Sequence, residues 1–319
     1  MRIIIYGVGA VGGTVAALLA RAGQEVVGIA RGTQLAAIRA GGLTLRTPAG
    51  AFAVRFTCHA APAKIAFRPD DAILLCMKTQ DTGAALAELR AAGVREQPIF
   101  CAQNGVENER LALRLFPNVH GVTVMLPAQF LTPGEVAAFG TPHVGFFDLG
   151  RFPGGVDAAD TTLAAALTAA SLPAFPLPDV MASKYGKLLM NLGNIVEAAF
   201  GPGPDNAAIT ARLRAEGQAA FAAAGIVWRD VGAADPRRDA LMQMADIDGI
   251  ARAGGSSTQS LARGTGSIET DYLNGEVALL GRLHGVATPL NAWFTTLAAR
   301  MAREGLAPGT IDRGTVPGD

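Results

Sequence analysis

Residues 1–31 read MRIIIYGVGAVGGTVAALLARAGQEVVGIAR, and this stretch decides the fold. The β-branched run at 3–6 predicts a buried strand, and the Ala- and Leu-rich segment after the glycines predicts a helix. A second apolar run at 25–30 predicts the next strand. Glycines at the strand–helix turn have the G-x-G-x-x-G spacing, so the unit is typical of dinucleotide binding.

Each glycine of this turn has its own physical role. Gly7 permits the tight turn, Gly9 lets a pyrophosphate approach the backbone, and Gly12 lets the helix pack closely on the strand. The free N–H groups and the dipole of the helix N-terminus then favour the phosphates. We expect the whole turn to bind the cofactor through Gly7, Val8, Gly9, Ala10, Val11 and Gly12.

The residue after the second strand indicates which dinucleotide is bound. NAD-binding units usually place an acidic residue there, to accept a hydrogen bond from the ribose 2′-OH. This chain has Arg31, whose forked donors suit a phosphate, so we predict NADP (NADPH) as the cofactor. The alternative is that Arg31 is an ordinary solvated loop charge.

Composition excludes several other classes of protein. The 319 residues are 50% hydrophobic, and 27 basic side chains balance 27 acidic ones, which argues against nucleic acid or an anionic membrane as partner. Three cysteines without CxxC spacing fit a reducing cytoplasm, and four scattered histidines predict no metal site. The uncharged run at 3–20 could pass for a signal peptide or membrane span, but its three spaced glycines and the strand that follows argue against both.

The rest of the chain divides into an α/β part and a helical part. We predict a Rossmann-type doubly wound domain at 1–177 and an all-α domain at 178–319. Within the first, short β-rich pieces between 120 and 149 are expected to be antiparallel strands that extend the sheet. In the second, helices are expected at 180–200, 207–225, 240–253, 267–284 and 289–304.

Two polar residues follow predicted parallel strands. Lys78 comes after the apolar run at 72–77, and Asn104 comes after the run at 97–102. Ligands of open α/β sheets bind at the carboxyl ends of strands, so both residues are candidates for the site. A solvated lysine and a plain Asn-Gly turn are the alternatives.

The helical part holds a polar stripe and an irregular motif. Lys184, Lys187, Asn191 and Asn194 are spaced to share one face of a helix, where they could be functional or simply solvent-facing. Farther on, Ser267 is expected to cap the fourth helix, with Glu269 in its first turn. Asn274-Gly275 inside that helix is unfavourable by propensity, which points to a packing or ligand reason.

Taken together, these motifs resemble those of the ketopantoate reductases (2-dehydropantoate 2-reductases), and the resemblance runs end to end. It rests on motifs that occur in the family's order: Gly7-x-Gly9-x-x-Gly12, Arg31, Lys78, Asn104-Gly105, Lys187-x-x-x-Asn191, and Ser257 with Glu269-x-Asp271-Tyr272-x-Asn274-Gly275. The resemblance implies NADPH-dependent reduction of 2-dehydropantoate, or of a related small 2-oxo acid, in pantothenate biosynthesis.

The resemblance also implies residue roles. Lys187 would be the general acid, and Glu269 would bind the substrate and orient Lys187. Lys78 and Asn104 would face the cofactor, and Asn104 would also face the substrate. Substrate contacts would come from Asn191 and Ser257.

One position departs from the family pattern. The better-known members have a second Asn four residues after the first, where this chain has Ile195. Asn194 lies one residue earlier, about 100° around the helix, and is a further candidate for contacting the substrate. The departure bears on the substrate rather than on the reaction class.

Two other functions also fit these motifs. A 3-hydroxy acid dehydrogenase can share the two-domain layout, and a non-catalytic NADP-binding sensor would bind the cofactor without turnover. The Ala-rich C-terminal helices could pack within the chain or across a homodimer.

Overall fold

The computed structural model describes residues 1–264 and 266–318. Its elements group into two compact units, one formed by Met1–Lys184 with Ala233–Arg252, the other by Tyr185–Gly232 with Ala253–Asp319. The chain therefore leaves the first unit within a helix and returns to it once.

The first unit is built on an eight-stranded sheet with the strand order β13-β12-β8-β7-β6-β1-β2-β5. Six strands, from β8 to β5, run parallel, while β12 is antiparallel to β8 and parallel to β13. In sheet order the strands are Ala174–Pro176, Phe146–Arg151, Val119–Met125, Ile99–Cys101, Asp71–Leu75, Arg2–Tyr6, Val26–Ile29 and Thr57–His59.

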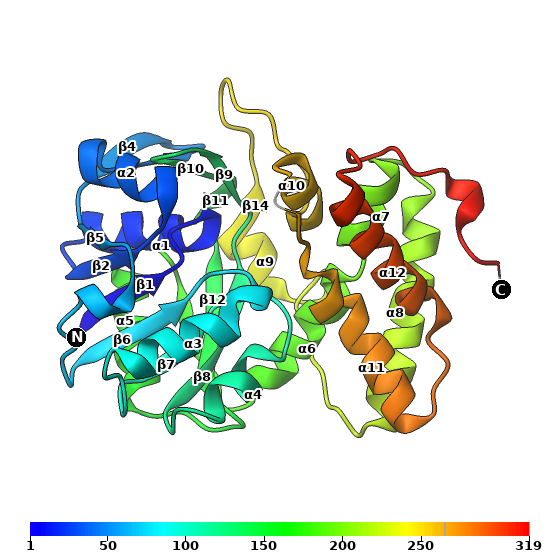
Figure 1. Cartoon of the computed structure of the whole chain (residues 1–319), viewed down its shortest axis with the longest axis horizontal. Coiled ribbons are helices and arrows are strands. Elements are labelled where there is room, and N and C mark those ends of the chain that lie inside the picture. Colours follow the sequence, from blue (N-terminus) through cyan, green and yellow to red (C-terminus); the bar gives the residue numbers. More distant parts are fainter. Residues whose placement is uncertain (265, 319) are drawn as a thin grey trace. The chain divides into compact units, whose positions relative to one another are not determined.

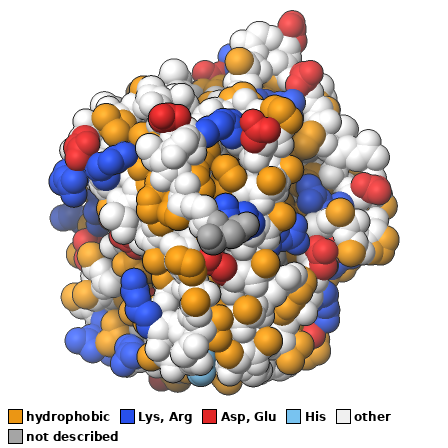
Figure 2. All heavy atoms as spheres, turned by 90° about the vertical axis from the view of Figure 1, so that its right-hand side faces the viewer, with side chains coloured by type: hydrophobic (Ala, Val, Ile, Leu, Met, Phe, Trp, Pro, Cys, Tyr) orange, Lys and Arg blue, Asp and Glu red, His pale blue; other side chains and the backbone are white. Residues whose placement is uncertain are grey.

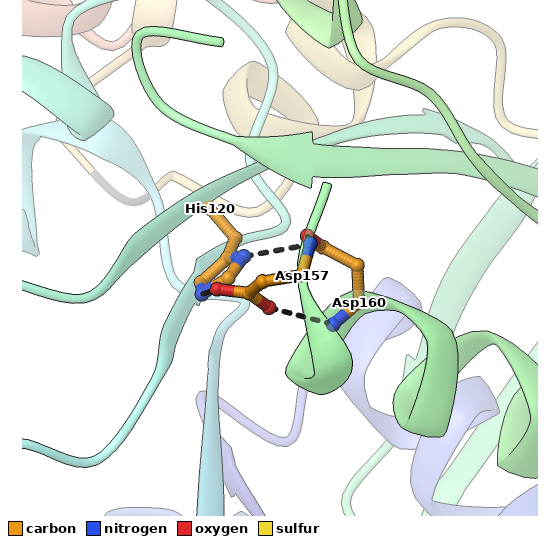
Figure 3. A group of neighbouring side chains, drawn as sticks. All are labelled: His120, Asp157 and Asp160. Atoms are coloured by element: carbon orange, nitrogen blue, oxygen red, sulfur yellow. Dashed lines mark hydrogen bonds and ion pairs between the residues drawn. The ribbon is translucent and has the colours of Figure 1, made fainter. Parts of the chain in front are cut away.

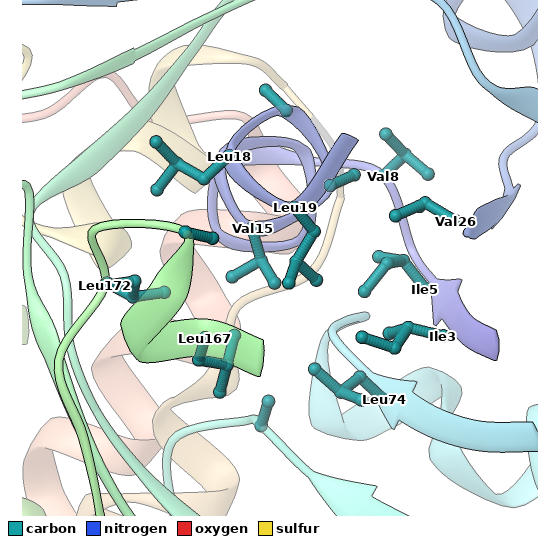
Figure 4. Close-up of a cluster of buried hydrophobic side chains, with 14 of the residues drawn as sticks. Ile3, Ile5, Val8, Val15, Leu18, Leu19, Val26, Leu74, Leu167 and Leu172 are labelled. Atoms are coloured by element: carbon teal, nitrogen blue, oxygen red, sulfur yellow. The ribbon is translucent and has the colours of Figure 1, made fainter. Parts of the chain in front are cut away.

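Helices cover both faces of this sheet (Figure 1). Helices α1 (Ala10–Arg21) and α5 (Ala158–Ala169) pack on one face through the cluster drawn in Figure 4, which includes Ile3, Val15 and Leu167. Helices α3 (Thr82–Ala91) and α4 (Asn108–Leu113) contribute to the apolar cluster on the other. The expected doubly wound α/β architecture is confirmed.

A smaller sheet with the order β4-β3-β10-β9 packs against α1. A Cβ at Gly13 of α1 would lie 3.1 Å from Val136 of β10, so small residues let helix and sheet approach. The remaining elements of this unit, apart from those at 180–184 and 233–252, are α2 Gly32–Gly41, β3 Leu43–Thr47, β4 Gly50–Val54, η1 Pro62–Lys64, η2 Thr79–Asp81, β9 Ala128–Thr132, β10 Glu135–Ala138 and β11 Gly140–Pro142.

The prediction of antiparallel strands between 120 and 149 was only partly right. β12 is antiparallel, but β8 pairs with β7 in parallel, and β9 and β10 belong to the smaller sheet. Pairing partners lie far away in the sequence, as with β10 and β3, so apolar alternation could not reveal them.

The predicted helix at 240–253 was wrong. The chain forms α9 (Pro236–Leu241) and then β14 (Met242–Met244), which pairs with β11 of the first unit. Arg237 donates to the carboxylate of Asp148 on β12 and to that of Asp235, which holds the segment Ala233–Arg252 against β12. These tertiary contacts outweigh the local helical pattern.

Helices are the only regular elements among the described residues of the second unit. Its elements are the end of α6 (Val180–Asn191), then α7 Asn194–Phe200, α8 Asn206–Ala223, α10 Ser256–Ala262, η3 Glu269–Tyr272, α11 Asn274–His284, α12 Pro289–Glu304 and η4 Arg313–Thr315. The last predicted helix, at 289–304, is confirmed to the residue.

Asn274 explains two breaks that the sequence did not predict. Its buried Nδ2 donates to Leu192 O, and Val196 N bonds instead to Gly193 O, so the predicted helix at 180–200 divides into α6 and α7. The same Nδ2 donates to Asn291 Oδ1. Asn274 therefore begins α11 rather than lying inside a helix, and Ser267 does not cap it.

Candidate functional site

The glycine turn has the geometry that dinucleotide binding requires. Gly7 has a φ of +99°, and a Cβ there would lie 2.6 Å from Met77 N. A Cβ on Gly12 would lie 2.1 Å from Gly7 O, so this position packs helix α1 on the strand. By contrast, a Cβ on Gly9 would meet no described heavy atom within 4 Å, so the space in front of it is open to a ligand.

These two glycines give a matched test. We expect Gly12→Ala to destabilise the fold by about 1–3 kcal/mol, because the added methyl group overlaps backbone. Gly9→Ala should leave the free energy of unfolding unchanged but weaken NADPH binding at least about tenfold, a cost of 1.4 kcal/mol. Denaturant unfolding and NADPH fluorescence titration measure the two effects; a Gly9→Ala protein that binds NADPH normally would contradict the assignment.

The loops after β6 and β7 are tied together by buried side chains. Gln103 Nε2 donates to Thr82 Oγ1, which donates to Asn108 Oδ1. Asn108 Nδ2 in turn donates to Thr79 Oγ1 and to Asn104 O. The network places the loops that carry Lys78 and Asn104 side by side at the carboxyl edge of the sheet.

Lys184 was predicted to share a functional or solvent-facing helix face with Lys187, but the structure buries it. Its side chain is only 2% exposed, and Nζ forms an ion pair with Glu109 and donates to Cys101 O and Gln103 O. Burial raises the pKa of the Glu109 carboxyl, and the Lys184 charge acts against that rise. The pair therefore fastens the start of α6 to the end of β7, within the first unit.

Lys187 and Asn191 lie one turn apart on α6, in the second unit. Lys187 is half-buried, with Nζ 3.9 Å from Met190 Sδ. Asn191 is buried, and its Nδ2 has no hydrogen-bond acceptor among the described residues. A buried donor left unsatisfied is costly, so this amide is suited to donate to a ligand that supplies the acceptor.

The stripe predicted for this helix ends at Asn191. Asn194 begins α7, and a Cβ on Gly255 would lie 3.4 Å from Asn194 Oδ1. Gly255 precedes α10, so Asn194 lies next to the helix that carries the buried Ser257. Ile195, the second residue of α7, is 1% exposed and belongs to the core.

Glu269 lies in the short helix η3, where its side chain is buried. It was expected in the first turn of a long helix that begins at Ser267, and the structure corrects this. Helix η3 packs against α11 and α12, so the helical unit holds the backbone that carries Glu269.

A cluster that the sequence did not reveal joins His120, Asp157 and Asp160 (Figure 3). His120 Nδ1 lies 2.8 Å from Asp160 Oδ1, and Nε2 lies 4.0 Å from Asp157 Oδ2. Both carboxylates also form the capping box of α5. Burial acts to raise the pKa of Asp157, but the Arg151 hydrogen bond and the nearby His120 outweigh it, so the pKa is lowered. We assign the cluster to holding α5 on β8.

Two broader features bear on partners. Basic and acidic side chains are interspersed over the face in Figure 2. None of the helices in the described residues is long and apolar enough to cross a membrane.

The three cysteines are free thiols, and burial raises the pKa of Cys58 to about 11 and that of Cys76 to about 12.

A doubly wound sheet with this glycine turn, together with a helical unit that carries a lysine and an amide one turn apart, defines a two-unit protein of the dinucleotide-binding class. The chain belongs to the ketopantoate reductase family: residues 3–153 match the family described as ketopantoate reductase PanE/ApbA, and residues 179–302 match its C-terminal part. Membership in this family indicates an oxidoreductase that acts on a CH–OH group and uses a nicotinamide cofactor.

Individual relatives agree along the whole chain. A protein named 2-dehydropantoate 2-reductase from Pyrococcus horikoshii is 27% identical, covering 97% of this chain and all of the relative. Another with that name, from Caulobacter vibrioides, is 29% identical over 92% of this chain and 97% of its own.

Solved structures show the same fold. A PanE/ApbA family ketopantoate reductase from Ralstonia eutropha has a TM-score of 0.80 at 28% identity, covering 96% of this chain and 99% of the other. A D-mandelate dehydrogenase bound to NADH and anilino(oxo)acetate has a TM-score of 0.79 at 22% identity, covering 96% of this chain and 99% of the other. At this identity the similarity is one of fold alone.

Proposed function

We propose that this protein is an NADPH-dependent reductase of a small 2-oxo acid, with 2-dehydropantoate as the first candidate and pantothenate biosynthesis as the pathway. The observation that carries the proposal is the buried, unsatisfied amide of Asn191 one turn from Lys187, in a chain of the ketopantoate reductase family. Two relatives named 2-dehydropantoate 2-reductase, which match nearly the whole chain, support the substrate.

The cofactor assignment rests on the turn and on Arg31. The open face of Gly9 and the N-terminus of α1 fit the pyrophosphate, and Arg31 at the end of β2 fits a 2′-phosphate. When bound, the nicotinamide supplies the hydride that reduces the substrate's carbonyl carbon. Lys78 and Asn104 are proposed to contact the cofactor from the neighbouring strand ends.

The remaining chemistry belongs to side chains of the helical unit. As the carbonyl carbon is reduced, negative charge develops on its oxygen, and the Lys187 ammonium stabilises that charge and donates its Nζ proton. The product is the 2-hydroxy acid. Glu269 is proposed to bind the substrate and to orient Lys187.

Polar groups near Lys187 are proposed to orient the substrate. Asn191 would donate its unsatisfied Nδ2 to a substrate oxygen, and Ser257 would add a hydroxyl contact. Asn194, beside the start of α10, is proposed to replace the family's second Asn, since Ile195 is buried in the core.

The test follows the loss of NADPH absorbance with 2-dehydropantoate and with a panel of other 2-oxo acids. We expect the highest kcat/KM on 2-dehydropantoate. Uniformly low rates on every acid would overturn the substrate, and cofactor binding without turnover of any acid would indicate a sensor instead.

A further inference from the structure

Three side chains form a charged cluster beside the dinucleotide turn, all within the first unit. Arg31 Nη2 lies 3.0 Å from Glu88 Oε1 and 3.5 Å from Tyr6 Oη. Tyr6 Oη in turn donates to Glu88 Oε2 at 2.5 Å. Tyr6 ends β1 directly before Gly7, Arg31 follows β2, and Glu88 comes from α3, so three elements meet at the expected ribose site.

Tyr6 holds the Glu88 carboxylate in place. The tyrosine is 4% exposed, and burial together with the Glu88 hydrogen bond raises the pKa of its phenol, so it remains a donor at neutral pH. The Arg31 and Glu88 side chains are 63% and 40% exposed, so both remain open to a ligand. The result is a fixed carboxylate next to an accessible guanidinium.

The two forms of the cofactor would meet this pair differently. A ribose 2′-OH can donate to a carboxylate, which is the contact that NAD-binding units usually make through an acid at the end of the second strand. A 2′-phosphate carries about −1.5 to −2 charges, so it is attracted by Arg31 and repelled by Glu88. Here the acid comes from α3 instead of β2, and it already pairs with the cation that the phosphate needs.

We propose that Glu88 is a cofactor-specificity residue, which competes with the 2′-phosphate for Arg31 and accepts a hydrogen bond from an unphosphorylated ribose. The inference rests on the proposed function in that the glycine turn must bind a nicotinamide dinucleotide. It adds that the preference for NADPH over NADH is smaller than Arg31 alone would produce.

The test measures binding of NADPH and NADH to the whole protein through the fluorescence of the reduced nicotinamide, without substrate. Glu88→Gln keeps the shape of the side chain and removes its charge. We expect it to tighten NADPH binding about three- to tenfold, because it releases Arg31 from a partly exposed ion pair and removes a charge that repels the 2′-phosphate. NADH binding should stay the same or weaken.

The chain offers a matched control and a second variant. Glu25→Gln also removes a carboxylate paired with an arginine, Arg68, but Glu25 precedes β2 and so lies at the opposite edge of the sheet. It should change neither affinity. Tyr6→Phe removes the donor that fixes Glu88 and should shift the affinity ratio toward NADPH by a smaller factor.

The possible results test the role of Glu88 separately from the proposed function. If NADPH binding weakens in Glu88→Gln, or if both affinities change equally, Glu88 does not set specificity and the inference fails. If the wild-type protein binds neither dinucleotide, the proposed cofactor is wrong and the proposed function fails with it.

Discussion

Lys187→Ala is expected to lower kcat on the preferred 2-oxo acid by about 10²- to 10⁴-fold, the usual contribution of a positioned general acid. The variant removes the side chain that we propose both donates the proton and stabilises the developing oxyanion. Cofactor affinity should be unchanged, because the glycine turn and Arg31 belong to the other unit. Steady-state kinetics with NADPH and fluorescence titration measure the two effects.

Two further variants make this result specific. Lys187→Arg keeps the positive charge but is not a usable acid at neutral pH, so it should recover substrate affinity more than kcat. Lys64→Ala removes an exposed lysine of the short helix η1 and should leave kcat unchanged. A normal kcat in Lys187→Ala would refute the proposed mechanism.

Lys184→Met should cost about 3–5 kcal/mol in the free energy of unfolding, because it leaves the Glu109 carboxylate buried without its partner. The matched double variant, Lys184→Met with Glu109→Leu, should recover most of that stability, since no buried charge remains unpaired. Denaturant unfolding of the three proteins measures the difference. A single variant as stable as wild type would show that the pair contributes nothing.

The same variant should have a characteristic pH dependence. Burial already raises the pKa of Glu109, and loss of Lys184 removes the charge that opposes this rise. A carboxyl group with a raised pKa in the folded state destabilises the fold only when the unfolded chain is ionised. The cost of Lys184→Met should therefore be small near about pH 4 and should grow as the pH rises toward neutrality.

Local patterns predicted the elements whose determinants lie close together in the chain. The glycine turn, α12 and the strands before Lys78 and Asn104 all lie where periodicity and turn chemistry placed them. The candidate site was foreseeable to the same degree, since Lys187 and Asn191 share a helix by spacing alone.

Elements that depend on residues far away in the sequence could not be predicted from local patterns. The break after α6 depends on Asn274, which lies 82 residues from the Leu192 carbonyl that it binds. The predicted helix at 240–253 is replaced by α9 and β14 because of a strand partner at 140–142 and an ion pair to Asp148. Neither the Arg31–Glu88 pair nor the Lys184–Glu109 pair has a local signature, since their members lie 57 and 75 residues apart.

By itself, the sequence determined that a dinucleotide turn begins an α/β domain, that a helical part follows, and that a lysine and an amide share a helix. Backbone geometry and side-chain period are local properties, so these conclusions needed no partner. Only the tertiary structure decided that Lys184 is a buried anchor rather than part of a polar stripe, and that Glu88 faces Arg31. Charge pairing depends on distances in space, which long loops and crossovers set independently of distance along the chain.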